Sequence, residues 1–523
     1  MATPRTGFRL LDWVERIGNR LPDPVTLFAA GALSILVGSH VAAMVGWQAS
    51  YVTRDGMREV AAKSLLVGDG LRWVWTNAVE NFTSFHPLGV VLVTMLGIGV
   101  AERSGLIGAL LKRVVVITPT SLLAPSFVLV GIMSNMAADA GYVVLPPLAA
   151  LIYAKVGRPP LAGMAAVFAG VAAGFSANLL PTSLDPLLQG LTQEAATILD
   201  RNYIVDVLCN YWFMIVSTIV LTAVGWFVTV RFVEPRFSKA DIEEQVASMH
   251  RELGDEVDAD AHVPTKAETR GLWWAAIVVA IGFAGLLALV LVPGGALGGS
   301  YLKGGREVPT WPDVIVPAMF VLFLLPGIAY GIASGSIRSD RDVAQMMGKT
   351  MSTMGMYVVL AFFAGQFVAW FKESNLGTLI ALAGVDLLKQ FHLPPLLLIA
   401  GIILLVAVLN LFVGSASAKW ALVSPVLVPL FMGLGIAPEL TQAAYRVGDS
   451  ATNAIAPLNP YLVVILVYMR QYLPKAGLGS LIALMLPYSI AFLIVWIVLL
   501  VGYVGLGVPL GPGDVPSFIE PIR

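Results

Sequence analysis

The chain has 523 residues, of which 57% are hydrophobic and only 12% are charged, and its formal net charge is −1. A soluble globular protein has about 25% charged residues, so this composition excludes a soluble fold and predicts an all-α polytopic membrane protein. The near-neutral charge gives no reason to expect a nucleic-acid partner. The single cysteine, Cys209, excludes an intramolecular disulfide and a cysteine-rich metal site.

The amino-terminal segment 1–22 combines arginines with acidic residues in a short amphipathic pattern. This pattern predicts a helix on the cytoplasmic surface and not a cleaved signal. Apolar runs that can cross about 30 Å of hydrocarbon follow it. Two of these runs are interrupted by Asn, Asp and Pro. The runs predict nine spans, near 24–46, 87–101, 160–184 (broken), 207–230, 272–293, 312–331, 350–371, 440–468 (broken) and 479–507.

Two further apolar segments, 121–153 and 395–436, each contain a polar break made of small residues. Non-helical backbone at bilayer depth is tolerated only where protein or water satisfies it, so each segment predicts a re-entrant hairpin. With the amino terminus inside, the predicted inner segments carry about twice as many Lys and Arg residues as the outer ones. This bias supports the topology and places the carboxy terminus outside.

The two halves of the chain resemble an internal repeat in opposite orientation. The stretch from Ser176 to Pro186 matches the stretch from Ala451 to Pro460, with an Asn near the start of each. An inverted repeat of hairpin plus broken helix is typical of secondary transporters, whose site lies between the halves. The predicted organisation is a first span and external loop (23–86), repeat 1 (87–232), an acidic cytoplasmic linker (233–270), intervening spans (271–349), repeat 2 (350–507) and an external tail (508–523).

Several charged residues fall inside the predicted hydrocarbon, where each costs at least about 2.5 kcal/mol and must face protein, water or substrate. Asp185 and Asp449 are the leading candidates to carry a proton or a coupling cation. Asp139 is a third, unless it caps the second helix of its hairpin. Arg446 is a candidate clamp for a substrate carboxylate; the alternative is a structural ion pair with Asp449, three residues away. Lys419 is expected to pair with an acid.

Polar side chains recur at matching hairpin tips and helix breaks. Their oxygens suit a small cation, and the amino ends of half-helices suit an anionic substrate; the alternative is hydrogen bonding between helices. The candidates are Asn135, Asn178, Ser415, Ser417 and Asn453. A Na⁺ position is expected near Asn178, Asp185, Asp449 and Asn453, with no other metal and no cofactor beyond the coupling H⁺ or Na⁺.

One aromatic residue and the absence of three complete motifs indicate the class of function. Trp420 follows the second hairpin tip and either stacks on an aromatic substrate ring or packs in the core. Gly348-Lys349-Thr350 ends like a phosphate-binding loop, but Val343 stands where the first glycine belongs, which argues against ATP-driven transport. Neither His-Glu-x-x-His nor Gly-x-Ser-x-Gly occurs in the sequence, so no enzyme is expected.

Five motifs together resemble the AbgT family, the p-aminobenzoyl-glutamate transporters, and the likeness runs from about residue 10 to 515. They are Ala138-Asp139-Ala-Gly141-Tyr142, Phe175-Ser176-Ala177-Asn178, Leu184-Asp185-Pro186-Leu187-Leu188, Gly414-Ser415-Ala416-Ser417-Ala418-x-Trp420 and Ala443-Ala444-Tyr445-Arg446-x-Gly448-Asp449. One departure is Pro181-Thr182-Ser183, where a Gly-Thr pair is expected before the aspartate.

The resemblance implies a homodimeric bacterial inner-membrane protein with nine spans and two hairpins, in the wider ion-transporter superfamily. It implies a cation-gradient-coupled secondary transporter that imports p-aminobenzoyl-glutamate or exports sulfonamide antimetabolites. The alternative is a sodium-coupled carrier of dicarboxylates or other organic anions; an ion channel or a membrane enzyme is less consistent with the sequence. Carried over by motif, the family's important residues are Asp185, Trp420, Pro438, Arg446 and Asp449. Ser417 and Pro457 lie nearby in the sequence and are further substrate-site candidates.

Overall fold

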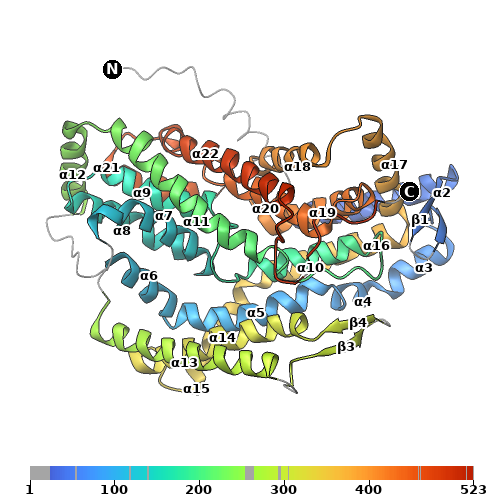
Figure 1. Ribbon diagram of the computed structural model, residues 1–523, viewed down its shortest axis with the longest axis horizontal. Coiled ribbons are helices and arrows are strands. Elements are labelled where there is room, and N and C mark those ends of the chain that lie inside the picture. Colours follow the sequence, from blue (N-terminus) through green and yellow to red (C-terminus); the bar gives the residue numbers. More distant parts are fainter. Residues whose placement is uncertain are drawn as a thin grey trace.

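The computed structural model is almost entirely helical (Figure 1). The residues that it describes are 24–53, 56–116, 119–137, 140–253, 264–292, 296–303, 306–457, 459, 461–513 and 515–521. The predicted surface helix over 1–22 and the candidate Asp139 lie outside these residues.

By length and composition, seven helices of the described residues can cross a membrane, Ala416–Gly433 of the second predicted hairpin among them, which confirms an all-α polytopic fold. Helices also occupy each of the nine predicted spans. Seven are continuous helices: α2 (Pro24–Met44), α5 (His86–Arg103), α11 (Tyr211–Val228), α13 (Lys266–Leu291), α14 (Trp311–Ser334), α16 (Gly355–Glu373) and α22 (Leu478–Gly505). The other two are broken, as predicted. They are α9 (Pro160–Phe168) followed by α10 (Leu184–Ala196), which begins where the predicted span 160–184 ends, and α20 (Pro438–Ala451) followed by α21 (Tyr461–Tyr472).

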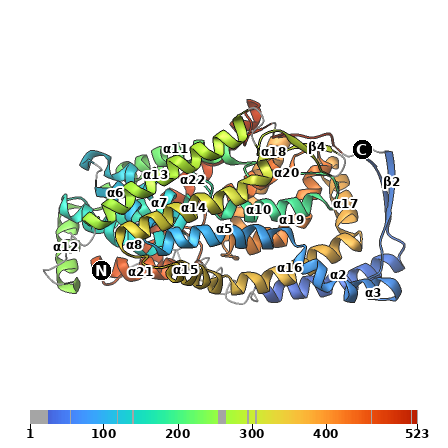
Figure 2. The same ribbon diagram turned by 90° about the horizontal axis from the view of Figure 1, so that it is seen from below.

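The two predicted hairpins are also present. α7 (Leu123–Met133) and α8 (Ala140–Lys155) flank the first break, and α18 (Pro395–Asn410) and α19 (Ala416–Gly433) flank the second. Both arms of each hairpin pack against the broken helix of their own repeat, α9 in the first and α20 in the second. Figures 1 and 2 place the two hairpins in opposite halves of the molecule, as an inverted repeat requires.

Glycines allow each broken helix to approach the first arm of its hairpin closely. A Cβ atom at Gly170, in the π-helical turn Ala169–Ala173 that continues α9, would lie 2.3 Å from the carbonyl oxygen of Val128 on α7. In the second repeat, a Cβ atom at Gly448 of α20 would lie 2.4 Å from the carbonyl oxygen of Ile403 on α18. Backbones can therefore touch at these points, which is how helices commonly associate in membranes.

The helix of the predicted linker and the two β-hairpins lie at opposite ends of the long axis (Figures 1 and 2). α12 (Lys239–Leu253), in the predicted linker, lies at one end. At the other end are two β-hairpins, β1 (Gln48–Thr53) with β2 (Gly56–Ala61) and β3 (Ser300–Lys303) with β4 (Arg306–Pro309). The described carboxy-terminal residues lie at this second end. The linker and the predicted external loops are thus on opposite sides.

Several predicted connections contain helices that the sequence reasoning did not identify. α15, for example, begins with a capping box in which Ser339 and Asp342 satisfy each other's backbone amides. α17 is too short to span a bilayer and meets α18 at a bend of 120°. Both were missed because the search was for long apolar runs. These additional helices are α3 (Gly68–Thr76), α4 (Ala78–Thr83), α6 (Leu106–Val116), α15 (Asp340–Thr353) and α17 (Leu376–Gln390).

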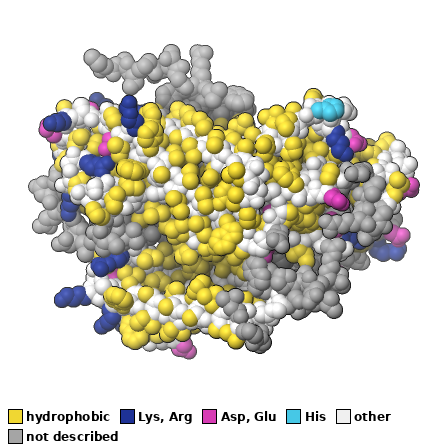
Figure 3. All heavy atoms as spheres, viewed as in Figure 1, with side chains coloured by type: hydrophobic (Ala, Val, Ile, Leu, Met, Phe, Trp, Pro, Cys, Tyr) yellow, Lys and Arg dark blue, Asp and Glu magenta, His cyan; other side chains and the backbone are white. Residues whose placement is uncertain are grey.

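The surface matches a bilayer crossed along the long axis. Figure 3 shows hydrophobic side chains over the middle of one face, with Lys, Arg, Asp and Glu gathered toward the two ends. Large apolar residues point outward on the spans, as with Trp273 and Ile281 on α13, which are 70% and 67% exposed. Such exposure is costly in water and favourable against lipid.

Substituting Gly448 with Ala should lower the melting temperature of the detergent-purified protein by several degrees. The added methyl group collides with the α18 backbone, and overpacking of this kind costs about 1–3 kcal/mol. Gly401→Ala on α18 is the control, because nothing lies within 4 Å of its Cβ position. Equal melting temperatures for the two variants would contradict the close α18–α20 contact.

Candidate functional site

Two buried ion pairs meet at α20, inside the protein. Arg446 Nη2 lies 2.5 Å from Asp185 Oδ1, and Lys419 Nζ lies 2.6 Å from Asp449 Oδ1. All four side chains are at most 3% exposed. The Arg446–Asp449 pair that sequence spacing allows is not formed, because each residue has a different partner. Lys419 pairs with an acid, as expected.

The first ion pair joins the two repeats. Asp185 lies in the first turn of α10, where the helix dipole favours a negative charge. Its second oxygen, Oδ2, accepts hydrogen bonds from the backbone nitrogen of Thr182 at 2.6 Å and from its hydroxyl at 3.1 Å. Thr182 belongs to the segment that departs from the family pattern, and this segment nevertheless orients the carboxylate toward Arg446.

Arg446 retains hydrogen-bonding capacity beyond this pair. Its Nη1 donates to the sulfur of Met214 at 2.9 Å, which is a weak acceptor. Its Nε is buried and has no hydrogen-bond partner among the described residues. A guanidinium carries five hydrogens in a planar fork suited to carboxylates. The arrangement therefore leaves donors available for another anionic group.

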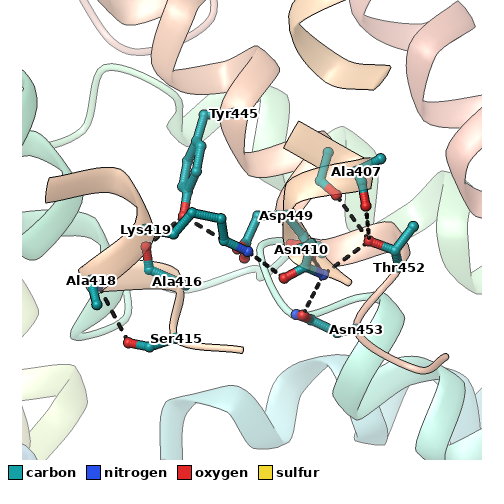
Figure 4. A network of polar contacts seen from close by, with 12 residues as sticks. Ala407, Asn410, Ser415, Ala416, Ala418, Lys419, Tyr445, Asp449, Thr452 and Asn453 are labelled. Atoms are coloured by element: carbon teal, nitrogen blue, oxygen red, sulfur yellow. Dashed lines mark hydrogen bonds and ion pairs between the residues drawn. The ribbon is translucent and has the colours of Figure 1, made fainter. Parts of the chain in front are cut away.

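The second ion pair is the centre of a polar network between α18, α19 and α20 (Figure 4). The Lys419 side chain extends from α19 to the Asp449 carboxylate and also donates to Asn410 Oδ1. The Tyr445 hydroxyl lies 3.2 Å from Asp449 Oδ1 and 2.5 Å from the carbonyl oxygen of Ala416. The other carboxylate oxygen, Asp449 Oδ2, is buried without a hydrogen-bond partner in the described part of the chain.

Asn410 is a central member of this network that the sequence reasoning missed. It is the last residue of α18, and its amide nitrogen donates to the carbonyl oxygen of Asp449, the hydroxyl of Thr452 and the amide oxygen of Asn453, at 2.6, 2.9 and 2.8 Å. The available signal was a single amide at the end of a long apolar run, four residues before Gly414.

The predicted helix-break residues occupy equivalent places in the two repeats. Asn178 and Asn135 both donate to the carbonyl oxygen of Ile132, near the end of α7, at 3.2 and 3.1 Å. Asn453 accepts from Asn410, at the end of α18. In each repeat the Asn of the broken helix thus holds the end of the first hairpin arm. The Ser176 amide donates to the Ser450 hydroxyl at 3.1 Å, which joins the two repeats directly.

The four residues expected near Na⁺ are each engaged with other protein groups. Asp185 and Asp449 bind Arg446 and Lys419, and the Asn178 amide oxygen accepts from the Leu180 backbone nitrogen. Asn453 Oδ1 accepts from the Asn410 side chain. The described residues contain no group of three or more His, Cys, Asp or Glu that could hold a metal ion. In this conformation protein groups therefore occupy the side-chain oxygens of Asp185, Asn178 and Asn453 and one oxygen of Asp449.

The remaining candidates surround the second hairpin. Trp420 is fully buried; its Nε1 donates to the Thr192 hydroxyl at 2.9 Å, and its ring packs on Tyr445 with centroids 4.4 Å apart. The Ser415 hydroxyl caps α19 by accepting from the Ala418 backbone nitrogen at 3.3 Å. Ser417 lines a small cavity between α10, α16 and α19.

The two candidate prolines mark helix boundaries. Pro438 begins α20, and Pro457 lies in the break between α20 and α21. Proline lacks a backbone donor and is favoured in the first helical turn. Both residues therefore shape the broken helix that carries Arg446 and Asp449.

A buried network of neutral and acidic side chains continues from Trp420 toward the start of α20. Its members had no signal in the sequence beyond their polarity. Thr192 donates to Gln442 Oε1 at 2.6 Å, and Gln442 donates to Asn210 Oδ1 at 3.0 Å. Asn210 in turn donates to the carbonyl oxygen of Glu439 at 2.9 Å. The network fixes the orientation of Trp420 relative to α10 and α20.

Comparison with known proteins identifies the family. The model of the AbgT putative transporter family matches residues 9–518. The chain belongs to this family. It is 34% identical over 510 residues to the p-aminobenzoyl-glutamate transport protein of Escherichia coli (strain K12), covering 97% of each chain. The resemblance noted from the sequence motifs is thereby confirmed.

Two solved structures of this family have the same fold. The YdaH transporter of Alcanivorax borkumensis superposes with a TM-score of 0.85 at 42% identity, over 94% of this chain and all of that one. MtrF of Neisseria gonorrhoeae, described as illuminating a class of antimetabolite efflux pumps, superposes with a TM-score of 0.87 at 43% identity, over 97% and 100%. This AbgT-family protein is therefore a multi-pass membrane transporter.

Substituting Asp185 with Asn should strongly lower the melting temperature, because it leaves Arg446 buried without a counter-charge, a change that costs about 3–5 kcal/mol. Combining Asp185→Asn with Arg446→Met should recover part of the loss, since no unpaired charge remains. The control is Glu373→Gln at the exposed Lys63–Glu373 pair, where an effect below about 1 kcal/mol is expected. A double variant less stable than the single one would contradict the pairing.

Proposed function

We propose that this protein is a cation-gradient-coupled secondary transporter of p-aminobenzoyl-glutamate or of sulfonamide antimetabolites. We further propose that it acts as a homodimer in the bacterial inner membrane, with its amino terminus in the cytoplasm and no enzymatic activity. The name of the related E. coli protein, a p-aminobenzoyl-glutamate transport protein, and the description of MtrF as illuminating a class of antimetabolite efflux pumps support the substrate class. The observation that carries the proposal is that Arg446 is buried at the interface of the two repeats. Its Nε is a hydrogen-bond donor without a partner among the described residues.

Arg446 is the proposed clamp for a substrate carboxylate. A carboxylate of p-aminobenzoyl-glutamate competes with Asp185 for the guanidinium and gains the Nε donor that has no partner in this conformation. Displacement would open the link between α10 and α20, and hence between the repeats. Asp185, once released, becomes an acceptor for a proton or cation, which couples ion binding to substrate binding.

The aromatic part of the substrate has a proposed place beside the second hairpin. The small cavity there is lined by Ser417 and Ala421 of α19, by Leu187 and Leu191 of α10, and by Phe85 and Tyr357. Apolar and aromatic walls of this kind suit a benzene ring. The cavity volume is about 10 Å³, enough for one water molecule at most, so the cavity would have to widen before a ring could enter. Trp420, next to Ala421, is held by Thr192 and Tyr445. It would contact the ring after these contacts rearrange.

Uptake of labelled p-aminobenzoyl-glutamate into proteoliposomes tests the proposal, with a proton gradient and a sodium gradient imposed separately. One of the gradients should drive uptake by the wild-type protein. Asp185→Asn and Asp449→Asn should each lower the rate at least about tenfold, because each leaves a buried cation unpaired. The control is Asp386→Asn, at an exposed residue on α17. Absence of wild-type uptake under either gradient would contradict import.

Two substitutions separate the substrate classes. If the substrate is aromatic, Trp420→Ala should abolish its transport. If the protein instead carries dicarboxylates, the same variant should remain largely active. Trp273→Ala, on the exposed face of α13, is the control. Arg446→Lys removes the planar fork. It should impair transport of p-aminobenzoyl-glutamate more than that of a sulfonamide, which lacks the glutamate carboxylates. Equal loss for both substrates would contradict Arg446 as the carboxylate clamp.

A further inference from the structure

The ammonium group of Lys419 occupies the position that a metal cation would take at Asp449. It lies 2.6 Å from Asp449 Oδ1 and contacts the amide oxygen of Asn410, both of which are hard oxygen ligands. The side chain is only 2% exposed. Lys419 enters this position from the fourth residue of α19, across the tip of the second hairpin (Figure 4).

The charges around this position are already balanced. The Lys419 ammonium and the Asp449 carboxylate neutralise each other, and the nearby Arg446 is neutralised by Asp185. The remaining side chains in contact with the pair, Tyr445 and Asn410, carry no net charge at neutral pH. A sodium ion bound to Asp449 would add an uncompensated positive charge beside the ammonium group, in a buried site where such repulsion is poorly screened.

The oxygens needed for a sodium shell are also in use. The Asn410 amide oxygen accepts a hydrogen bond from Lys419, and the Asn453 amide oxygen accepts one from the Asn410 amide nitrogen. Among the described side-chain oxygens of this Lys419–Asp449 network, Asp449 Oδ2 is the one that is buried without a hydrogen-bond partner. One free oxygen is too few for a metal ion that takes several oxygen ligands, whereas a proton needs only one acceptor atom.

We infer that Lys419 is an ion-selectivity residue, which fills the cation position at Asp449 and excludes Na⁺ from it. The inference rests on the proposed function in treating the coupling ion as a cation. Because Na⁺ is then excluded from Asp449, the coupling ion at the Lys419–Asp449 pair is a proton. A purely structural ion pair would stabilise the protein equally, but it would not control the response to sodium.

Sodium-dependent melting of the purified protein tests this inference without any substrate. Melting temperatures are measured in NaCl and in choline chloride at equal ionic strength. The wild-type protein should melt within about 1 °C in the two salts. Lys419→Gln leaves Asp449 as an unpaired carboxylate that Na⁺ can neutralise, so NaCl should raise its melting temperature by about 2 °C or more at ten times the dissociation constant.

Two further variants assign the sodium response to this position. Lys419→Arg keeps the positive charge and should remain insensitive to Na⁺. The double variant Lys419→Gln with Asp449→Asn removes both charges and should lose the sodium response of the single variant. Sodium-specific stabilisation of the wild-type protein that disappears in Asp449→Asn would overturn the inference, as would a folded Lys419→Gln variant without a sodium response.

If Lys419→Gln fails to fold, the wild-type protein and Asp449→Asn still decide the question. A sodium site at Asp449 would make NaCl raise the melting temperature of the wild-type protein but not that of Asp449→Asn. A wrong assignment of the substrate leaves these melting results unchanged, since no substrate is present. Conversely, loss of substrate uptake with the expected melting pattern would contradict the proposed function alone.

Discussion

Charge inside a low-dielectric interior must be balanced by a nearby opposite charge, and the centre of this protein is arranged around that requirement. Arg446 and Asp449 lie one turn apart on α20 but pair with different elements. Arg446 binds Asp185 on α10 of the first repeat, and Asp449 binds Lys419 on the second hairpin. α20 is therefore held on two sides by interactions that fail if either partner is removed.

The two repeats form similar contacts between the broken helix and the first hairpin arm. In each repeat a glycine brings the broken helix against the first hairpin arm, and an Asn at the break bonds to the end of that arm. The repeats differ in their charges. The second repeat contributes Lys419, Arg446 and Asp449, whereas the first contributes Asp185 to the pairs described. The two repeats thus share a glycine contact and an Asn contact but contribute different charges to the site.

The conformation described here is a closed one at the site. Arg446, Lys419, Asp185 and Asp449 are sealed from solvent, and Trp420 is packed between Thr192 and Tyr445. A transporter needs such a state to prevent leakage between the two openings. In the proposed function, a substrate carboxylate and a cation compete for the bonds that close the site, so that binding and opening would share the same contacts.

The sequence by itself determined the membrane class, the spans, both hairpins and both broken helices, because apolar length and helix-breaking residues act locally. It also indicated that Lys419, Asp185, Arg446 and Asp449 need partners, because charge in hydrocarbon is costly wherever it lies. Only the tertiary structure decided the pairing, since Arg446 and Asp185 are 261 residues apart. Local spacing favoured Arg446 with Asp449, and the role of Asn410 depends on three helices that meet only in the folded chain.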